Sequence, residues 1–193
     1  HGAPPYGNHA PVEHLFTNNG TSGSLAIAFA LLKNRKGARF YSAMSAAATD
    51  EILTGHSGPW WNILWSGLGA GVAGPEMTAA YYKKMHWLHT ITRCWDGRYV
   101  GLMGWGSSPK SGRMSDTGSH LVNLCAGRRA IHITGKALDD SLWLSRAEAE
   151  EIIEAGNIDG SSKSTLLELL GSRFPPVRVR AAQALARMDA DVT

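Results

Sequence analysis

Apolar residues recur at helical spacing along most of the chain. The run SGSLAIAFALLK, from Ser22 to Lys33, is apolar nearly all round, and its many alanines favour a buried helix. Between Ala38 and Leu53, aromatic, Met and Ala residues fall three and four positions apart, which predicts a second helix with Gly55 as its C-cap. No segment carries a convincing alternation of apolar and polar residues, so the pattern indicates helices rather than strands.

The stretch HSGPWWNILWSGLGAGVAGPE, residues 56–76, combines three tryptophans with five glycines. Pro59 suits the first turn of a short helix, which we expect the glycines from Gly67 to Gly74 to break. Pro75 then begins a longer helix, PEMTAAYYKKMHWLHTITRCW, followed by a turn at residues 95–98. This part of the chain therefore predicts two helices separated by a glycine-rich break.

Beyond residue 115 the sequence predicts further helices and a terminal hairpin. Residues 116–126 predict a short helix, and Ser145 with Glu148 forms a capping box for a further one that closes at Gly156. The segment TLLELLGSRFPPVRVRAAQALARM predicts two antiparallel helices broken at residues 174–176, and its PxVRxxAAxAL pattern resembles a HEAT repeat. One such unit cannot bury both of its faces, so we expect it to dock on the preceding domain or on a protein partner.

The predicted fold class is all-α, with consecutive helical hairpins. We expect a helical domain over residues 1–140, then a linker helix and the HEAT-like hairpin over residues 141–193. The composition of the 193 residues, 44% hydrophobic and 18% charged, excludes a disordered chain.

The net charge and the cysteine content limit which partners and metal sites the sequence supports. The formal charge of +3 is too small to indicate nucleic acid, and no apolar run approaches the roughly 18 residues that span a membrane. Cys94 and Cys125 are too few for a zinc site of their own, and either one disulfide or two free thiols fits their number. We expect no cofactor.

Several long segments carry a family resemblance. FTNNGTSGSLAIAF, RFYSAMSAAATDE, DTGSHLVNLCAGRRAIHITGK, the terminal hairpin and above all residues 55–100 are similar to a bacterial domain family of unknown function numbered 6288. The resemblance runs from about Asn18 to Met188. It implies a fold similar to the α/α toroid of terpenoid cyclases and toroidal polysaccharide lyases, inside a much longer protein. The family has no established activity, so the resemblance supplies no catalytic residue.

The first residue is His rather than Met, and the opening HGAPPYG does not resemble a signal peptide. We therefore expect a processed protein or a fragment, compatible with export as part of a longer precursor. Its compartment is unknown.

Polar and aromatic residues near the glycine-rich loops and helix starts form the candidate site, because helix ends of a toroid share one mouth. A lyase on acidic polysaccharide needs an amide or cation for the substrate carboxylate, and a His or Tyr that removes the adjacent proton. Tryptophans can stack on sugar rings. The catalytic candidates are His56, Tyr81 and Asn18, and the ligand-binding candidates are Asn19, Trp60, Asn62, Tyr82 and His86. The alternative is that these residues belong to the core, to turns and to helix caps.

The other polar residues give weaker indications of function than this candidate site. His86 and His89 share a helix face, but without HExxH we expect a hydrogen-bonded pair and no metal site. Asp116, Ser119 and His120 are hydrolase residue types without a GxSxG elbow. The functional hypothesis is therefore an uncharacterised helical module with an aromatic-rich cleft for a ligand or protein, and the alternative is a carbohydrate-active lyase.

Overall fold

The computed structural model describes residues 19–53, 59–101, 116–128, 140–154, 158 and 160–190. Within these residues the regular structure is helical, and the only β-type pairing is an isolated antiparallel bridge between Arg93 and Tyr99. The prediction of an all-α fold is confirmed. The helices are α1 (Asn19–Leu31), α2 (Arg35–Ala47), η1 (Ala48–Glu51), α3 (Pro59–Gly71), α4 (Pro75–Ile91), α5 (Asp116–Ala126), η3 (Asp140–Leu142), α6 (Arg146–Glu154), α7 (Lys163–Leu169) and α8 (Pro175–Ala190).

Helix starts follow local signals in the sequence. Gly74, with φ of 101°, precedes Pro75 at the first turn of α4, a position where a residue with a side chain would be strained. The predicted capping box of α6 is present: the Ser145 backbone N–H donates to Glu148 Oε2 (2.8 Å), and the Glu148 N–H donates to Ser145 Oγ (3.4 Å). The carboxylate of Glu148 also pairs with Arg173, which ties α6 to the turn before α8.

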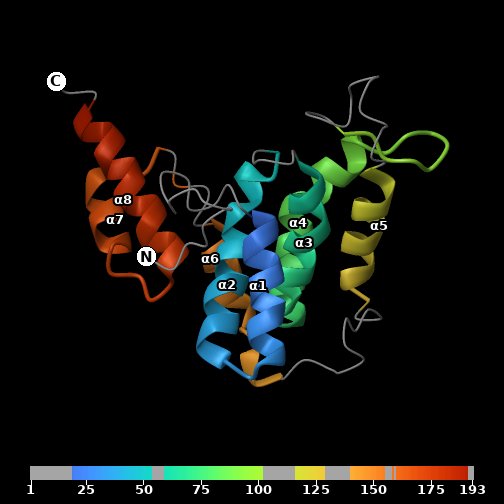
Figure 1. Ribbon diagram of the computed structural model, residues 1–193. Helices are drawn as coiled ribbons and strands as arrows, with labels where there is room; N and C mark the ends of the chain where they lie inside the picture. Colours follow the sequence, from blue (N-terminus) through green and yellow to red (C-terminus); the bar gives the residue numbers. More distant parts are fainter. Residues whose placement is uncertain are drawn as a thin grey trace, which may run out of the picture.

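The central part of the molecule is a bundle of α1, α2, α3, α4 and α6 (Figure 1). Helix α5 lies on one side of it and packs against α3, whereas the α7–α8 hairpin lies on the other side, with α8 against α2. The larger core cluster takes small and medium side chains from α2, α3, α4 and α6, among them Met44, Ile63, Met77, Met85 and Ile152. Because α6 contributes to this core, it is packed into the bundle and is more than a connector.

We expected the glycines of α3 to break the helix, and this prediction is wrong. Helix α3 continues through Gly67 and Gly69 to Gly71, and the missing side chains are used for close packing instead. A Cβ on Gly69 would lie 2.4 Å from the Cα of Gly23 in α1, and one on Gly67 would lie 2.7 Å from Asn123 Nδ2 in α5. These glycines let α1 and α5 approach the backbone of α3.

The C-terminal hairpin forms as predicted. Ser162 caps α7 by accepting from the Thr165 N–H (3.2 Å), and Leu166, Val177 and Ala181 are buried. The likeness to a HEAT repeat, the toroid and the domain boundary at residue 140 stay predictions.

Candidate functional site

Polar side chains line the contact between α3, α4 and α5. We call this group the polar seam, and it consists of Ser66, Tyr81, Tyr82, His89, His120 and Asn123. Each of these residues is buried except Tyr82, which is half-buried. Burial of this many polar groups is stable only where they bond to one another or to the backbone.

Tyr81 and Asn123 hold the inner end of the seam. The Tyr81 hydroxyl is hydrogen-bonded to Ser66 Oγ, and burial raises the pKa of Tyr81 to about 12. Asn123 Nδ2 donates to the Ile63 carbonyl oxygen (2.5 Å) and lies 3.4 Å from Ser66 Oγ. The Tyr82 hydroxyl donates to the Asn123 carbonyl oxygen, and burial raises the pKa of Tyr82 as well. The two tyrosines therefore stay protonated near neutral pH.

A histidine pair forms the outer end of the seam. His89 Nδ1 of α4 and His120 Nδ1 of α5 are 2.9 Å apart, so one ring donates a hydrogen bond to the other. Both Nε2 atoms are buried and have no hydrogen-bond partner in the described structure. Burial lowers the pKa of both rings, and that of His120 falls to about 4. The pair is therefore neutral at pH 7.

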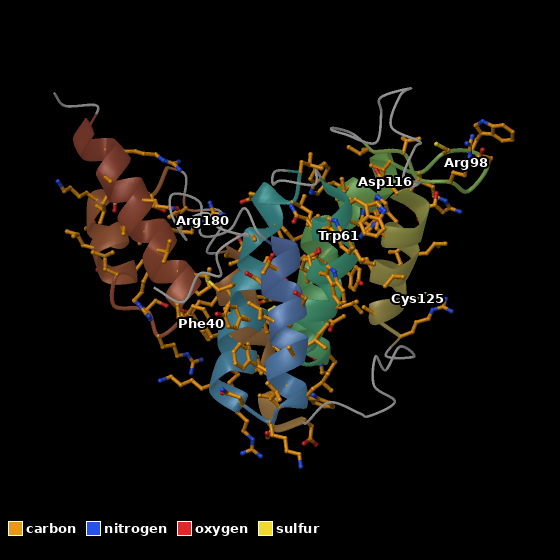
Figure 2. The ribbon with its side chains drawn as sticks, viewed as in Figure 1. Phe40, Trp61, Arg98, Asp116, Cys125 and Arg180 are labelled. Carbon is orange, nitrogen blue, oxygen red and sulfur yellow. The ribbon has the colours of Figure 1, made fainter. Side chains whose placement is uncertain are left out.

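The loop after α4 joins the seam at His120. The ring of Tyr99 stacks on that of His120, with centroids 4.4 Å apart and an angle of 12° between the planes. Asp116, labelled in Figure 2, is buried at the start of α5. Burial raises the pKa of its carboxyl group. A Cβ on Gly101 would lie 2.3 Å from Asp116 Oδ2, so the glycine leaves room for that carboxyl group.

Two of the described candidates from the sequence, Tyr81 and Asn62, are buried and bonded within the protein. Tyr81 has its hydroxyl bonded inside the seam, and Asn62 links three elements by accepting from the Gly20 N–H (3.1 Å) and donating to the Ile52 carbonyl oxygen (3.2 Å). Trp60 is half-buried and packs edge-to-face against Trp61, the labelled residue on α3 in Figure 2. His56 and Asn18 lie outside the described residues, as does the side chain of Asn19. The roles assigned to these eight residues stay predictions.

The two histidines of MHWLH point different ways. His86 is exposed and lies 3.5 Å from Thr90 Oγ1, whereas His89 is buried against α5. The expected hydrogen-bonded pair of His86 and His89 does not form, because His89 pairs with His120 instead. Across the described residues no group of three or more His, Cys, Asp or Glu side chains is arranged to hold a metal ion. Cys94 and Cys125 are both free.

A groove lies outside the seam, between α4 and α6. Its volume is about 510 Å³, and its lining combines small or apolar side chains with charges of both signs. The lining residues are Glu76, Ala79, Ala80, Lys83, Lys84, Arg146, Glu150, Ile153 and Glu154. Its polar residues are charged ends of long side chains rather than a converged catalytic set, so the groove suits binding of a complementary surface.

Comparison with known proteins identifies the family. Residues 1–135, more than half of the chain, match the family described as Domain of unknown function (DUF6288). The chain belongs to this DUF6288 family. No curated protein and no solved structure matches it. The DUF6288 match covers α1 to α5, and so includes the polar seam, whereas α6 and the α7–α8 hairpin lie beyond it. None of the described helices is long and apolar enough to cross a membrane.

Sequence reasoning missed the seam as a unit. His120 was recognisable only as a hydrolase residue type beside Asp116, and its pairing with a residue 31 positions away has no local signal. Neither Asn123 nor Ser66 was assigned to a candidate site from the sequence. The one available signal was the presence of Ser, His and Asn at three- and four-residue spacing on α5, which predicts a polar helix face.

Proposed function

We propose that this chain is a non-catalytic helical module that binds a protein partner through the outer face of the α7–α8 hairpin. Helix α8 packs on α2 as well as on α7, whereas α7 packs mainly on α8. The observation that carries the proposal is the exposure of Leu167 and Leu170, which are 53% and 37% exposed and lie one turn apart. Two leucines on one face of a helix at the edge of the molecule are typical of an interaction surface.

The occupant we propose is a helical hairpin of another protein. Helix α7 has seven residues, too few for a helix to be stable by itself, and its only buried side chain is Leu166. Stacking of a second hairpin on α7 would bury Leu167 and Leu170 in the way that successive repeats bury each other in a solenoid. Lys163, one turn before Leu167, and Glu168, directly after it, are both exposed, and they favour a partner helix that combines apolar residues with charged ones.

Burial argues against the lyase alternative. A base must reach its substrate, but the Tyr81 ring is 1% exposed and its hydroxyl is bonded to Ser66. A pKa of about 12 also leaves this phenol without a basic form at neutral pH. Asn62, the described amide candidate, is likewise buried and bonded to backbone.

Site-specific crosslinking tests the proposal. A photo-reactive amino acid at position 167 should capture one protein in cells of the source organism, whereas the same amino acid at the equally exposed position 121 of α5 should not. The captured protein is then purified and titrated against the native chain and a Leu167→Ser variant. We expect at least about tenfold weaker binding from the loss of one buried apolar side chain. Equal binding of the Leu167→Ser and native chains, with Leu121→Ser as control, would overturn the proposal.

A further inference from the structure

Helix α5 is held on the bundle mainly by polar contacts. It lies at one side of the molecule (Figure 1), and neither core cluster takes a side chain from it. Its apolar Val122 and Leu124 are only half-buried. Its buried residues are all polar, namely Asp116, Ser119, His120 and Asn123. Because a helix of 11 residues is also marginal in water by itself, its form and position depend on the hydrogen bonds of the polar seam.

Three contacts fasten α5 to its neighbours. Asn123 Nδ2 donates to a backbone carbonyl oxygen of α3 (2.5 Å). The Tyr99 N–H donates to Thr117 Oγ1 (3.0 Å), and the Tyr99 ring stacks on that of His120. The third contact is the bond between His89 of α4 and His120 in the middle of α5. Histidine is the residue type among these that ordinarily changes its charge between pH 5 and pH 8.

The histidine pair has no favourable position for an additional proton. In the neutral pair one Nδ1 carries a hydrogen and donates it, and the other Nδ1 accepts it. The donor ring can take up a proton only at Nε2, which is buried and has no partner among the described residues. The acceptor ring can take one up only at the Nδ1 that the hydrogen bond already uses. Protonation therefore either buries an unpaired cation or breaks the bond between α4 and α5.

The surroundings of the pair supply no compensating negative charge. In the described part of the chain α3 has no titratable residue, and the titratable groups on the other neighbouring elements are Tyr82 and His86 on α4, Asp116 and Cys125 on α5, and Tyr99 with the ion-paired Asp96 and Arg98 in the loop after α4. No ion pair joins Asp116 to either ring among the described residues. Burial raises the pKa of Asp116, so this carboxyl group loses its charge more readily as the pH falls.

We propose that the histidine pair is a pH-sensitive latch, and that proton uptake by His89 and His120 releases α5 from α3 and α4 while the rest of the bundle stays folded. The bundle can remain folded because both core clusters are built without α5. Release exposes both rings to water, where they bind protons with ordinary affinity, so a lower pH favours the released form. The latch is remote in sequence from the α7–α8 hairpin, and its test does not involve the proposed partner.

Native-state hydrogen exchange followed by NMR tests the latch on the unmodified chain. The N–H groups of residues 120–126 bond within α5, so their exchange reports the opening of this helix. After correction for intrinsic rates, we expect them to be less protected at pH 7 than the slowest amides of α2 and α4. Their exchange should also depend only weakly on low urea concentrations, because the opening of one helix exposes little surface.

The pH dependence of this exchange is the second measurement. Between pH 7 and pH 4.5, proton uptake at His120 alone lowers the protection of α5 roughly 50-fold. His89 acts in the same direction and Asp116 in the opposite one, so we expect a fall of about tenfold or more. Equal protection of α5 and the slowest bundle amides would show that α5 opens only when the whole chain unfolds. That result, or a protection of α5 that is the same at both pH values, would overturn the proposal.

A double variant separates the histidines from other causes. His89→Leu combined with His120→Leu replaces both partners by apolar side chains, so that neither is left without its hydrogen bond. The protection of α5 in this variant should not fall between pH 7 and pH 4.5, whereas Leu121→Ser, on the exposed side of α5, should show the native fall. A double variant that keeps the native fall would also overturn the proposal. Circular dichroism checks its helix content, and the measurements on the native chain decide even if this variant does not fold.

Discussion

The buried histidine pair should make the stability of the protein depend on pH. His120 is fully buried and neutral in the folded chain, with a pKa lowered from 6.5 to about 4 by burial and by the nearby His89. Below pH 6.5 the unfolded chain takes up a proton at His120 that the folded chain does not. The free energy of unfolding therefore decreases as the pH is lowered. The fall ends near pH 4, where the folded chain binds the proton as well. At 1.36 kcal/mol for each pKa unit, His120 contributes on the order of 3 kcal/mol to this loss.

A His120→Phe variant removes the contribution of His120 to the pH dependence of stability. Phenylalanine keeps a ring against Tyr99 but cannot titrate, and it leaves His89 Nδ1 without a partner, at a cost of about 1–3 kcal/mol at pH 7. Between pH 7 and pH 4 the unfolding free energy of the variant should fall less than that of the native chain, by roughly 3 kcal/mol. Asp116, whose raised pKa acts in the opposite direction, and Glu148, whose lowered pKa acts in the same direction, affect both proteins alike.

Urea denaturation followed by circular dichroism at pH 7, 6, 5 and 4 measures these free energies. The exposed and non-titrating Leu121 of α5 supplies the control, because Leu121→Ser should retain the native pH dependence. Proton NMR gives an independent reading: the His120 signal, identified by its absence in His120→Phe, should titrate near pH 4. A midpoint at pH 6 or above, or equal slopes in the native and His120→Phe proteins, would refute the reasoning.

Three substitutions test the packing of the described helices, and a thiol assay tests the state of the cysteines. Gly69→Ala should destabilise the fold by about 1–3 kcal/mol in urea denaturation, because its Cβ would lie 2.4 Å from the Cα of Gly23. Gly118→Ala, on the open side of α5, is the control and should stabilise the fold by up to about 1 kcal/mol. Equal effects of the two substitutions would contradict the role of close helix approach. Asn62→Ala should lower the unfolding free energy by about 1–3 kcal/mol, since it leaves the buried Gly20 N–H and Ile52 carbonyl without their partner, and an unchanged value would show that water replaces the amide. Cys94 and Cys125 should both react with a thiol reagent without prior reduction, and a count below two in the unfolded protein would indicate a disulfide.

Elements with local causes were predictable from the sequence. The capping box at Ser145, the proline start of α4 and the short helix α5 depend on residues within a few positions of each other, and all three appear in the structure. The α7–α8 hairpin was recognisable for the same reason, because the prolines at 175 and 176 fix the start of its second helix.

Contacts across helices were not predictable in this way. Gly67 and Gly69 look like helix breakers in the sequence, and only the position of α1 and α5 shows why they belong inside α3. Tyr81 looks like a candidate base until its hydroxyl is seen bonded to Ser66. His89 looks like the partner of His86, four-fifths of a turn away, but the tertiary fold brings His120 closer. Residue type and spacing predict that a side chain is polar, and only packing decides whether it faces a ligand or another helix.

The glycine contact between α1 and α3 also affects how mutational data on this protein should be interpreted. Gly20, Gly23 and Gly69 lie where any added atom meets backbone of the facing helix, since a Cβ on Gly23 would lie 2.3 Å from the Trp65 carbonyl oxygen. A saturation screen should therefore reject every other amino acid at these three positions. Such complete intolerance is often interpreted as a sign of an active site. Here it would reflect only the close approach of α1 and α3.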